Sequence, residues 1–351
     1  MIGKRWKGLA LILPLVFLAA ACNPGKKATN AGAAYPDDYY KGKTITWVVS
    51  GSAGGGTDVL VRAYAPFLSK YLPGNPKIEF KYLTGGGGIE AANYIYNVAK
   101  PDGLTLASLG SEQINSQILG DSGVKYKFEK LTFLGNFLGR DQMLWVRGSF
   151  GVKTFQDLLN STKQPKMGAR TASHSTALLP LVLAAAFPDK PLFKMVYGYD
   201  GGSDVDLDIE RGALDGRSNS VGSVEATHQD WIDKGFLVPL VYEGQKRHPD
   251  FPNVPTVDEV IPAEHKDLIN LLRAPDLATR PPVAPPTLPD GIAQILRKAF
   301  VAMSNDADFK KKVEDLGYPF QWIPPQDTQK SVASVLSDPN LEADFKKIVG
   351  K

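Results

Sequence analysis

The chain has 351 residues, of which 43% are hydrophobic and 22% are charged, and this balance excludes an intrinsically disordered protein, which would be poorer in apolar residues. Forty basic against 37 acidic residues give a net charge of +3, but three basic residues, Lys4, Arg5 and Lys7, precede an apolar run at the N-terminus. Without them the count is 37 against 37, so the chain has no general electrostatic attraction for nucleic acid or an anionic membrane. Any anion must therefore bind at a local site.

The N-terminus has the pattern of a secretory signal: a basic start, an apolar stretch over residues 9–18, and three alanines before Cys22, the only cysteine. The apolar stretch is shorter than the roughly 20 residues that a transmembrane helix needs. We therefore expect a signal peptide over residues 1–21, acylation of Cys22 as in bacterial lipoproteins, and a flexible tether over residues 22–41. An ordinary secreted protein is the alternative, because Leu18 lies four residues before the cysteine and the lipoprotein pattern prefers three.

From residue 44 onward, strand-like and helix-like patterns alternate. Residues 44–50 are rich in β-branched and aromatic side chains, which predicts a strand, and residues 58–71 have the apolar spacing of a helix. The next elements expected are a strand at 77–83, a turn at 85–88, a helix at 89–99 and a strand at 105–109. This order predicts an α/β fold with mainly parallel sheets, whose ligands lie beyond the carboxyl ends of the strands.

A second α/β pattern begins in the middle of the chain. The elements expected there are strands at 131–137, at 143–146 and near Met167, and helices at 154–161 and 176–187. Residues 204–209 alternate acidic and apolar side chains as a strand would, but the sequence that follows resembles a helix end, so we favour a helix. Proline-rich segments in the last third flank expected helices at 290–303 and 306–316.

The most informative motif is the glycine-rich segment GSAGGGTD, residues 51–58, between an expected strand and an expected helix. A helix N-terminus carries unpaired N–H groups and a partial positive charge, so this loop can form a cradle for an anion. It is not a Walker A loop, since no lysine follows the last glycine, and it lacks the dinucleotide-binding spacing. A loop built only for a tight turn is the alternative. Residues 85–88 are four further glycines one unit later, and the two loops would lie side by side at one sheet edge.

Patterns for catalysis and for metal binding are incomplete. Ser173 and His174 are adjacent and so point in different directions, and the chain has no nucleophile elbow. The four histidines lack ligand spacing, and residues 204–215 lack the glycine and glutamate that a calcium loop needs. Basic residues are spread along the chain, which disfavours nucleic acid. We expect no catalytic residue, no metal and no cofactor.

Five segments, in this order, carry a resemblance to a known family: GSAGGGTDVLVRAYAPFLSKYLPGNP, TGGGGIEAANYIYNVAKPDGLTL, GYDGGSDVDLDIERGALDGR, FPNVPTVDEV, and RPPVAPPTLPDGIAQILRKAF with a following helix that ends in DLGY. They resemble the Bug-type (TctC-like) extracytoplasmic solute receptors of tripartite tricarboxylate transporters. The resemblance implies a two-domain periplasmic-binding-protein fold of type II, with mainly parallel sheets flanked by helices and a ligand cleft between the domains. Domain 1 would comprise residues 42–139 and 241–351, and domain 2 residues 140–240.

Members of that family trap a small carboxylate, largely with backbone amides, hydroxyls and ordered water. Carried over position by position, the resemblance implies that the ligand is contacted by Ser52, Gly55, Gly56, Thr57 and Asp58 in the first loop, Gly86 and Gly87 in the second, and Thr171, Ser173, Tyr197, Asp200, Gly201 and Asn219 across the cleft. It implies a non-enzymatic, monomeric receptor in the periplasm or on the outer face of the cytoplasmic membrane, which meets the membrane only through a lipid anchor. Its partners would be a small organic carboxylate and the membrane subunits of a transporter. An exported sensor or enzyme that uses the same cleft is the alternative.

The chain departs from the family pattern in two loops. Ala53 precedes the glycines where many members have proline and glycine, and residues 170–173 are Arg-Thr-Ala-Ser where the loop is usually glycine-rich. Arg170 could form a bidentate ion pair with a second carboxylate of the ligand, because a guanidinium matches the geometry of a carboxylate. The alternative is that Arg170 points to solvent.

Overall fold

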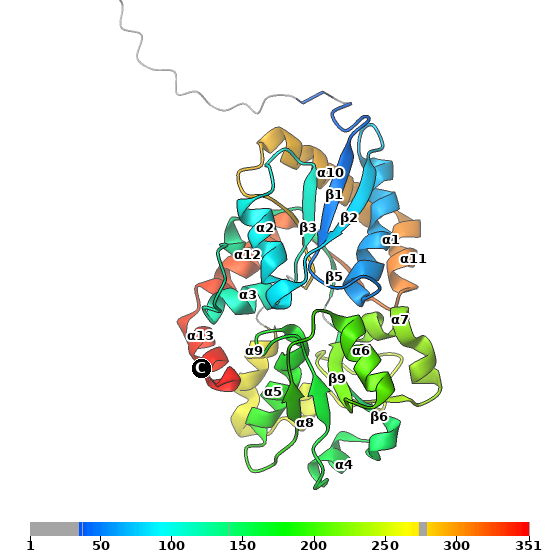
Figure 1. Cartoon of the computed structure of the whole chain (residues 1–351), viewed down its shortest axis with the longest axis vertical. Coiled ribbons are helices and arrows are strands. Elements are labelled where there is room, and N and C mark those ends of the chain that lie inside the picture. The colour runs from blue at the N-terminus through cyan, green and yellow to red at the C-terminus, as the bar shows by residue number, and fades with distance from the viewer. Residues whose placement is uncertain (1–34, 37, 140, 274–278, 351) are drawn as a thin grey trace, which may run out of the picture. The chain divides into compact units, whose positions relative to one another are not determined.

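Two five-stranded sheets with helices packed on their faces make up most of the computed structural model, which describes residues 35–350 except 37, 140 and 274–278 (Figure 1). The expected signal peptide, Cys22 and most of the expected tether lie outside the described residues. The end of that tether is packed: Tyr40 is fully buried, and the hydroxyl of Tyr39 donates a hydrogen bond of 2.6 Å to the carbonyl of Asp102. In the part of the chain that is described, no helix combines the length and the apolar character needed to cross a membrane.

The first sheet has the order β2-β1-β3-β11-β4. Its strands are β1 (Thr44–Val49), β2 (Lys77–Tyr82), β3 (Thr105–Ser108), β4 (Thr132–Phe133) and β11 (Pro282–Ala284). β1 pairs in parallel with β2 and β3, whereas β11 pairs antiparallel with both β3 and β4. Four of the five strands therefore run in one direction, as the predicted mainly parallel sheet requires.

The second sheet repeats this plan in the order β10-β6-β9-β7-β8. Its strands are β6 (Gln142–Arg147), β7 (Lys166–Gly168), β8 (Lys194–Val196), β9 (Gly216–Ser220) and β10 (Leu237–Tyr242). β7 is parallel to β8 and β9, and β6 is the single reversed strand between β9 and β10. In each sheet the reversed strand is the one that the chain reaches after leaving the other sheet. A small third sheet pairs β5 (Asn136–Leu138) with β12 (Phe320–Ile323).

Several helices lie where apolar periodicity predicts them, but three long ones, Val221–Asp233, Pro325–Leu336 and Pro339–Val349, were not expected from the sequence. The helices are α1 (Gly56–Tyr71), α2 (Ile89–Asn97), α3 (Ser111–Ile118), α4 (Phe155–Leu159), α5 (Ser175–Ala186), α6 (Gly202–Arg211), α7 (Val221–Asp233), α8 (Val257–Val260), α9 (Ile269–Arg273), α10 (Asp290–Asn305), α11 (Ala307–Glu314), α12 (Pro325–Leu336) and α13 (Pro339–Val349). Residues 204–209 belong to α6, which confirms the favoured helix. The expected strand at 131–137 is split into β4 and β5, since Gly135 between them has a φ of +119°.

Three buried apolar clusters hold these layers together. One is aromatic and lies between the first sheet and helices α1, α10 and α11, with the ring of Phe137 within 5.8 Å of the rings of Tyr64, Phe300 and Phe309. A second covers the outer face of the second sheet around Trp145. The third contains residues of both sheets, such as Ala107 of β3 and Leu144 of β6. Because residues 34–351 form one compact unit by their contacts, the predicted domain boundaries stay a prediction.

Candidate functional site

The first turns of five helices meet around one small cavity of about 70 Å³. Its lining includes Gly56 and Thr57 of α1, Ser111 and Glu112 of α3, Ser175 and Thr176 of α5, Gly202 of α6 and Ser223 of α7. Every helix N-terminus presents N–H groups without intrahelical partners and a partial positive charge. Five of them around one cavity make a site that favours an anion.

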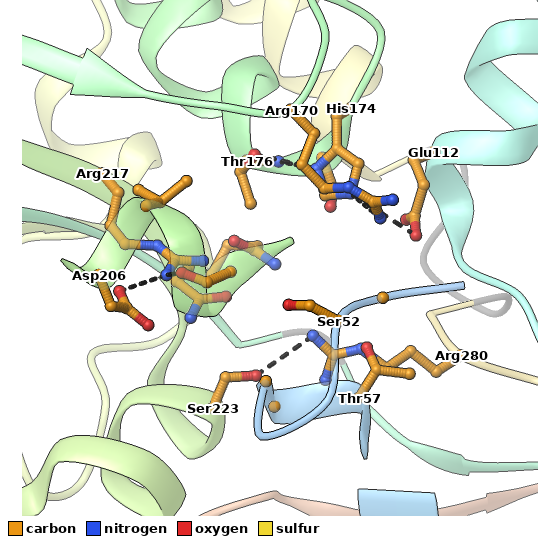
Figure 2. Close-up of a pocket in the computed structure, with 18 of the residues that line it drawn as sticks. Ser52, Thr57, Glu112, Arg170, His174, Thr176, Asp206, Arg217, Ser223 and Arg280 are labelled. Atoms are coloured by element: carbon orange, nitrogen blue, oxygen red, sulfur yellow. Dashed lines mark hydrogen bonds and ion pairs between the residues drawn. The ribbon is translucent and has the colours of Figure 1, made fainter. Parts of the chain in front are cut away.

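Three arginines from separate parts of the chain line the same cavity (Figure 2). Arg170 follows β7, Arg217 lies in β9, and Arg280 precedes β11. Arg170 and Arg217 are only 6% and 3% exposed. Each of the three also has one buried guanidinium nitrogen that finds no hydrogen-bond partner in the described part of the chain, and a buried donor left unpaired costs about 1–3 kcal/mol. Such donors are the complement of an anionic ligand.

The carboxylates beside the cavity neutralise only part of this charge. Asp206 pairs with Arg217, which also donates a hydrogen bond of 2.9 Å to the carbonyl of Gly202. Glu112 is the second acidic residue of the lining. Three arginines against two carboxylates leave the lining with a charge of +1 when His174 is neutral.

His174 lines the cavity as a neutral side chain. Its Nδ1 accepts a hydrogen bond of 3.1 Å from the backbone N–H of Thr176, which assigns the proton to Nε2. Nε2 lies 3.7 Å from Oε1 of Glu112 and 3.5 Å from Nη1 of Arg170. Burial, and then the positive charges of Arg170, Arg217 and Arg280, hold the pKa of His174 well below its usual range. The positive potential of the cavity therefore comes from the arginines and the helix N-termini, without a contribution from His174.

The structure brings six of the predicted contact residues to the cavity wall. They are Ser52, Gly55, Gly56, Thr57, Arg170 and Asn219. The other eight do not line it: Asp58, Gly86, Gly87, Thr171, Ser173, Tyr197, Asp200 and Gly201. Direct contact of any of these residues with a ligand stays a prediction.

The second glycine loop is held by its neighbours beside the cavity. Gly86 and Gly87 have φ values of +60° and +69°, a conformation that favours glycine. Gln113 donates a hydrogen bond of 2.9 Å to the carbonyl of Gly87, and Nη2 of Arg170 donates one of 2.7 Å to the carbonyl of Thr84. The alternative in which Arg170 points to solvent is therefore wrong, since its guanidinium bonds to this loop.

The remaining predicted residues have other surroundings. The hydroxyls of Thr171 and Ser173 lie 3.0 Å apart, and that of Ser173 is 3.1 Å from the hydroxyl of Ser116. Tyr197 is 42% exposed. A Cβ on Gly201 would lie within 2.8 Å of the backbone nitrogen of Ser52, so this glycine permits the close approach of two loops.

Asp58 shapes the first loop from below the cavity, and its replacement by alanine is expected to lower stability. Its buried carboxylate accepts hydrogen bonds of 2.8 Å from Gly54 N–H, 2.9 Å from Arg62 Nε and 2.7 Å from the Tyr82 hydroxyl. We expect Asp58→Ala to lower the free energy of unfolding by about 1–3 kcal/mol, as measured in urea, because these donors lose their acceptor. Asp308→Ala, an exposed aspartate in the first turn of α11, is the control. Lower ligand affinity with unchanged stability would instead place Asp58 in contact with the ligand.

Glu225 of α7 is expected to make stability fall as pH rises. Burial, and then the nearby Asp250 and Asp141, raise its pKa from 4.5 to about 7. Between those values the unfolded chain releases a proton that the folded protein keeps, so stability decreases across this window and then levels off. We expect Glu225→Gln to raise the melting temperature at pH 8 and to leave it nearly unchanged at pH 4. Glu314→Gln, on an exposed position of α11, should change neither value, and equal effects at both pH values would contradict the assignment.

Local sequence reasoning did not select Glu112, Arg217 or Arg280, and it gave His174 neither a catalytic nor a metal-binding role. Arg280 stands at the start of the RPP segment that resembles the known family, so the motif contained it without a role. Arg217 lies in the strand GRSNS, all of which is buried although it has no large apolar residue. Because such a strand lacks the apolar pattern that predicts burial, the sequence contains no signal that identifies Arg217. The described residues contain no group of histidines, cysteines and acids arranged to hold a metal ion.

Comparison with known proteins shows the family and the fold of this chain. Residues 61–337 match the family model described as "Tripartite tricarboxylate transporter family receptor". The "UPF0065 protein in gbd 5'region" of Cupriavidus necator is 28% identical over 239 residues, which cover 64% of this chain and 66% of that protein.

Solved structures share the fold. The periplasmic binding protein BugD has a TM-score of 0.74 at 19% identity and is matched over 88% of this chain and 98% of its own. MatC from Rhodopseudomonas palustris with bound malate has a TM-score of 0.68 at 20% identity, over 88% of this chain and 99% of its own. An R. palustris protein with adipate has a TM-score of 0.71 at 20% identity, over 88% and 98%. These similarities confirm the predicted two-domain periplasmic-binding-protein fold.

Proposed function

The chain belongs to the family of tripartite tricarboxylate transporter receptors, and from this premise we propose that it captures a small organic carboxylate in the arginine-lined cavity and delivers it to membrane transporter subunits. The observation that carries the proposal is the convergence of three arginines and five helix N-termini on one cavity. Two proteins with a similar fold hold malate and adipate, which are both small carboxylates. The proposed role is that of a receptor and not of an enzyme, because the family model that matches the chain is that of a receptor.

Hydrogen bonds that join the first glycine loop to α6, and α7 to the segment before β12, support a mechanism of closure around the ligand. The hydroxyls of Ser52 and Ser203 lie 2.6 Å apart, and those of Ser223 and Tyr318 lie 2.8 Å apart. Tyr318 also donates a hydrogen bond of 3.2 Å to the carbonyl of Gly56, at the start of α1. An anion between the arginines favours the closed form, and a transporter can distinguish that form from the open one. The transporter then accepts the receptor only when a ligand occupies the cavity.

A thermal-shift screen of the protein without residues 1–22, against organic acids, amides, sugars and nucleotides, tests the ligand class. A ligand present at 100 times its dissociation constant adds about 2.7 kcal/mol of stability, which the screen detects. We expect selective hits among carboxylates, confirmed by calorimetry, and recovery of each hit unchanged after prolonged incubation. Stabilisation by another class and by no carboxylate would overturn the proposed function, and chemical conversion of a hit would overturn the receptor role.

We further propose that the mature protein is a monomer in the periplasm, anchored by an acylated Cys22. Labelling of growing cells with a radioactive fatty acid should mark the wild-type protein and leave Cys22→Ser unlabelled. Light scattering of Cys22→Ser should give the mass of a single chain, and a larger mass would contradict the proposed monomer.

Uptake of the identified carboxylate should fall in cells that lack this protein and return when it is supplied, and an unchanged uptake would refute the role in transport.

A further inference from the structure

Glu112 is a carboxylate that faces a cavity built for anions, and the proposed function does not use it. It lies in the first turn of α3, and its side chain is 13% exposed. A glutamate in the first turn of a helix ordinarily stabilises the helix dipole from the surface. This one lines the cavity, where Figure 2 shows it beside Arg170 and His174.

The side chain of Glu112 occupies space beside Gly110, although the backbone conformation at Gly110 does not require a glycine. A Cβ on Gly110 would lie 2.1 Å from Oε2 of Glu112 and 2.5 Å from its Cδ, so the side chain folds back over this residue. Gly110 has a φ of −106° and a ψ of −177°, an extended conformation that any residue adopts. Glycine at this position therefore makes room for the carboxylate of Glu112.

The two acidic residues of the lining differ in their partners. Asp206 bonds to Arg217 and lies 3.3 Å from Nε2 of His228, so its oxygens are engaged. Nε2–H of His174 lies 3.7 Å from Oε1 of Glu112, which is beyond a direct hydrogen bond. The carboxylate of Glu112 can therefore accept a hydrogen bond from a group inside the cavity, next to arginines that attract a carboxylate.

We infer that Glu112 accepts a hydrogen bond from the ligand, so that the carboxylate bound in this cavity also carries an ammonium or hydroxyl donor. The inference rests on the proposed function and narrows its ligand class to amino or hydroxy acids. If the ligand has no such donor, the carboxylate of Glu112 is repelled by the carboxylate of the ligand and gains no hydrogen bond in return. The lining charge of +1 is matched by a ligand with two carboxylates and one ammonium group.

Calorimetry with ligands that differ at one carbon tests this inference. The probes are three series in which position 2 carries hydrogen, hydroxyl or ammonium: propionate, lactate and alanine; succinate, malate and aspartate; adipate, 2-hydroxyadipate and 2-aminoadipate. In the series whose length fits, we expect a donor-bearing member to bind about tenfold or more tighter than the member without a donor, because a hydrogen bond to a charged group is among the stronger ones.

Two variants remove the acceptor in different ways. Glu112→Gln should reduce the preference for a donor-bearing ligand to less than about threefold. The affinity of a hydroxyl ligand should fall less than that of an ammonium ligand, because glutamine keeps an oxygen acceptor but loses the negative charge. Gly110→Ala keeps the charge of Glu112 but displaces its carboxylate, and should reduce the preference as well. Glu342→Gln, an exposed glutamate in the first turn of α13, is the matched control.

The outcomes separate this inference from the proposed function. If Glu112 serves only as a counterion of Arg170, Glu112→Gln changes the affinity of every member of a series by the same factor, and the inference fails. A wild-type protein that binds carboxylates without preference for a donor also overturns it, while the proposed function survives. No binding of any carboxylate in the screen overturns both.

Discussion

Replacing Arg280 by methionine is expected to weaken binding of the anionic ligand about 100-fold or more and to leave the protein folded. Truncation of one partner in a buried hydrogen-bonded charge pair costs about 2–5 kcal/mol. The guanidinium donates a hydrogen bond of 3.3 Å to the hydroxyl of Ser223 and lies 5.6 Å from the ring centre of Tyr318. Its Nη1 has no hydrogen-bond partner among the described residues, so the substitution removes few hydrogen bonds from the unliganded protein.

Calorimetry at two salt concentrations measures this effect and its electrostatic origin. Affinity of the wild type should fall as salt rises, and the dependence should be weaker in Arg280→Met because one charge is gone. Arg280→Lys should recover part of the affinity, since it restores the charge without the fork of donors. Arg297→Met is a matched control, because Arg297 donates a hydrogen bond of 3.1 Å to the carbonyl of Phe133 and does not line the cavity. Equal affinities of wild type and Arg280→Met would remove Arg280 from the site.

The elements that the sequence predicts correctly are those whose buried face is apolar. α10 is such a helix, with Ile292, Leu296 and Phe300 buried at helical spacing. α3 has no such signal, because its buried face consists largely of polar residues. Asn115 donates a hydrogen bond of 3.1 Å to the carbonyl of Ser173, and Gln113 binds the second glycine loop. Apolar periodicity cannot identify a helix whose contacts are hydrogen bonds, and Glu112, the residue of our further inference, lies on this helix.

In the site, too, the sequence predicts the part that is built from neighbouring residues of the chain. The first glycine loop lies between a strand and a helix that adjoin it in the chain, so local sequence predicts an anion cradle there. The order of the second sheet places β9 beside β7 and so brings Arg217 near Arg170, whereas Arg280 precedes β11 of the first sheet and lines the cavity from that sheet. No spacing between residues 170, 217 and 280 encodes that neighbourhood. The predicted site was made largely of backbone amides and hydroxyls and included one arginine, Arg170, whereas the cavity is lined by Arg217 and Arg280 as well.

Valine in place of Gly201 is expected to abolish binding of every ligand, by more than about 100-fold, by keeping two loops apart. A Cβ at this position would lie 1.9 Å from Oγ, 2.5 Å from Cβ and 2.8 Å from the backbone nitrogen of Ser52. Rotation of the serine side chain does not relieve a clash with its backbone, so the first glycine loop must move away from the start of α6. Gly201 has a φ of −158°, so valine itself is not strained there.

The loss of affinity in Gly201→Val has a steric cause, and three measurements distinguish it from the loss of a charge in Arg280→Met. Gly201→Val should keep a melting temperature close to that of the unliganded wild type, and small-angle scattering should show no compaction when ligand is added. Gly139→Ala is the control, since the nearest atom to a Cβ there is the flexible end of Gln321, at 3.1 Å. Because all three arginines remain, any residual binding should keep the salt dependence of the wild type, whereas Arg280→Met reduces that dependence. Wild-type affinity in Gly201→Val would show that the close contact between Gly201 and Ser52 is not needed for binding, and the proposed closure would then have to rest on other contacts.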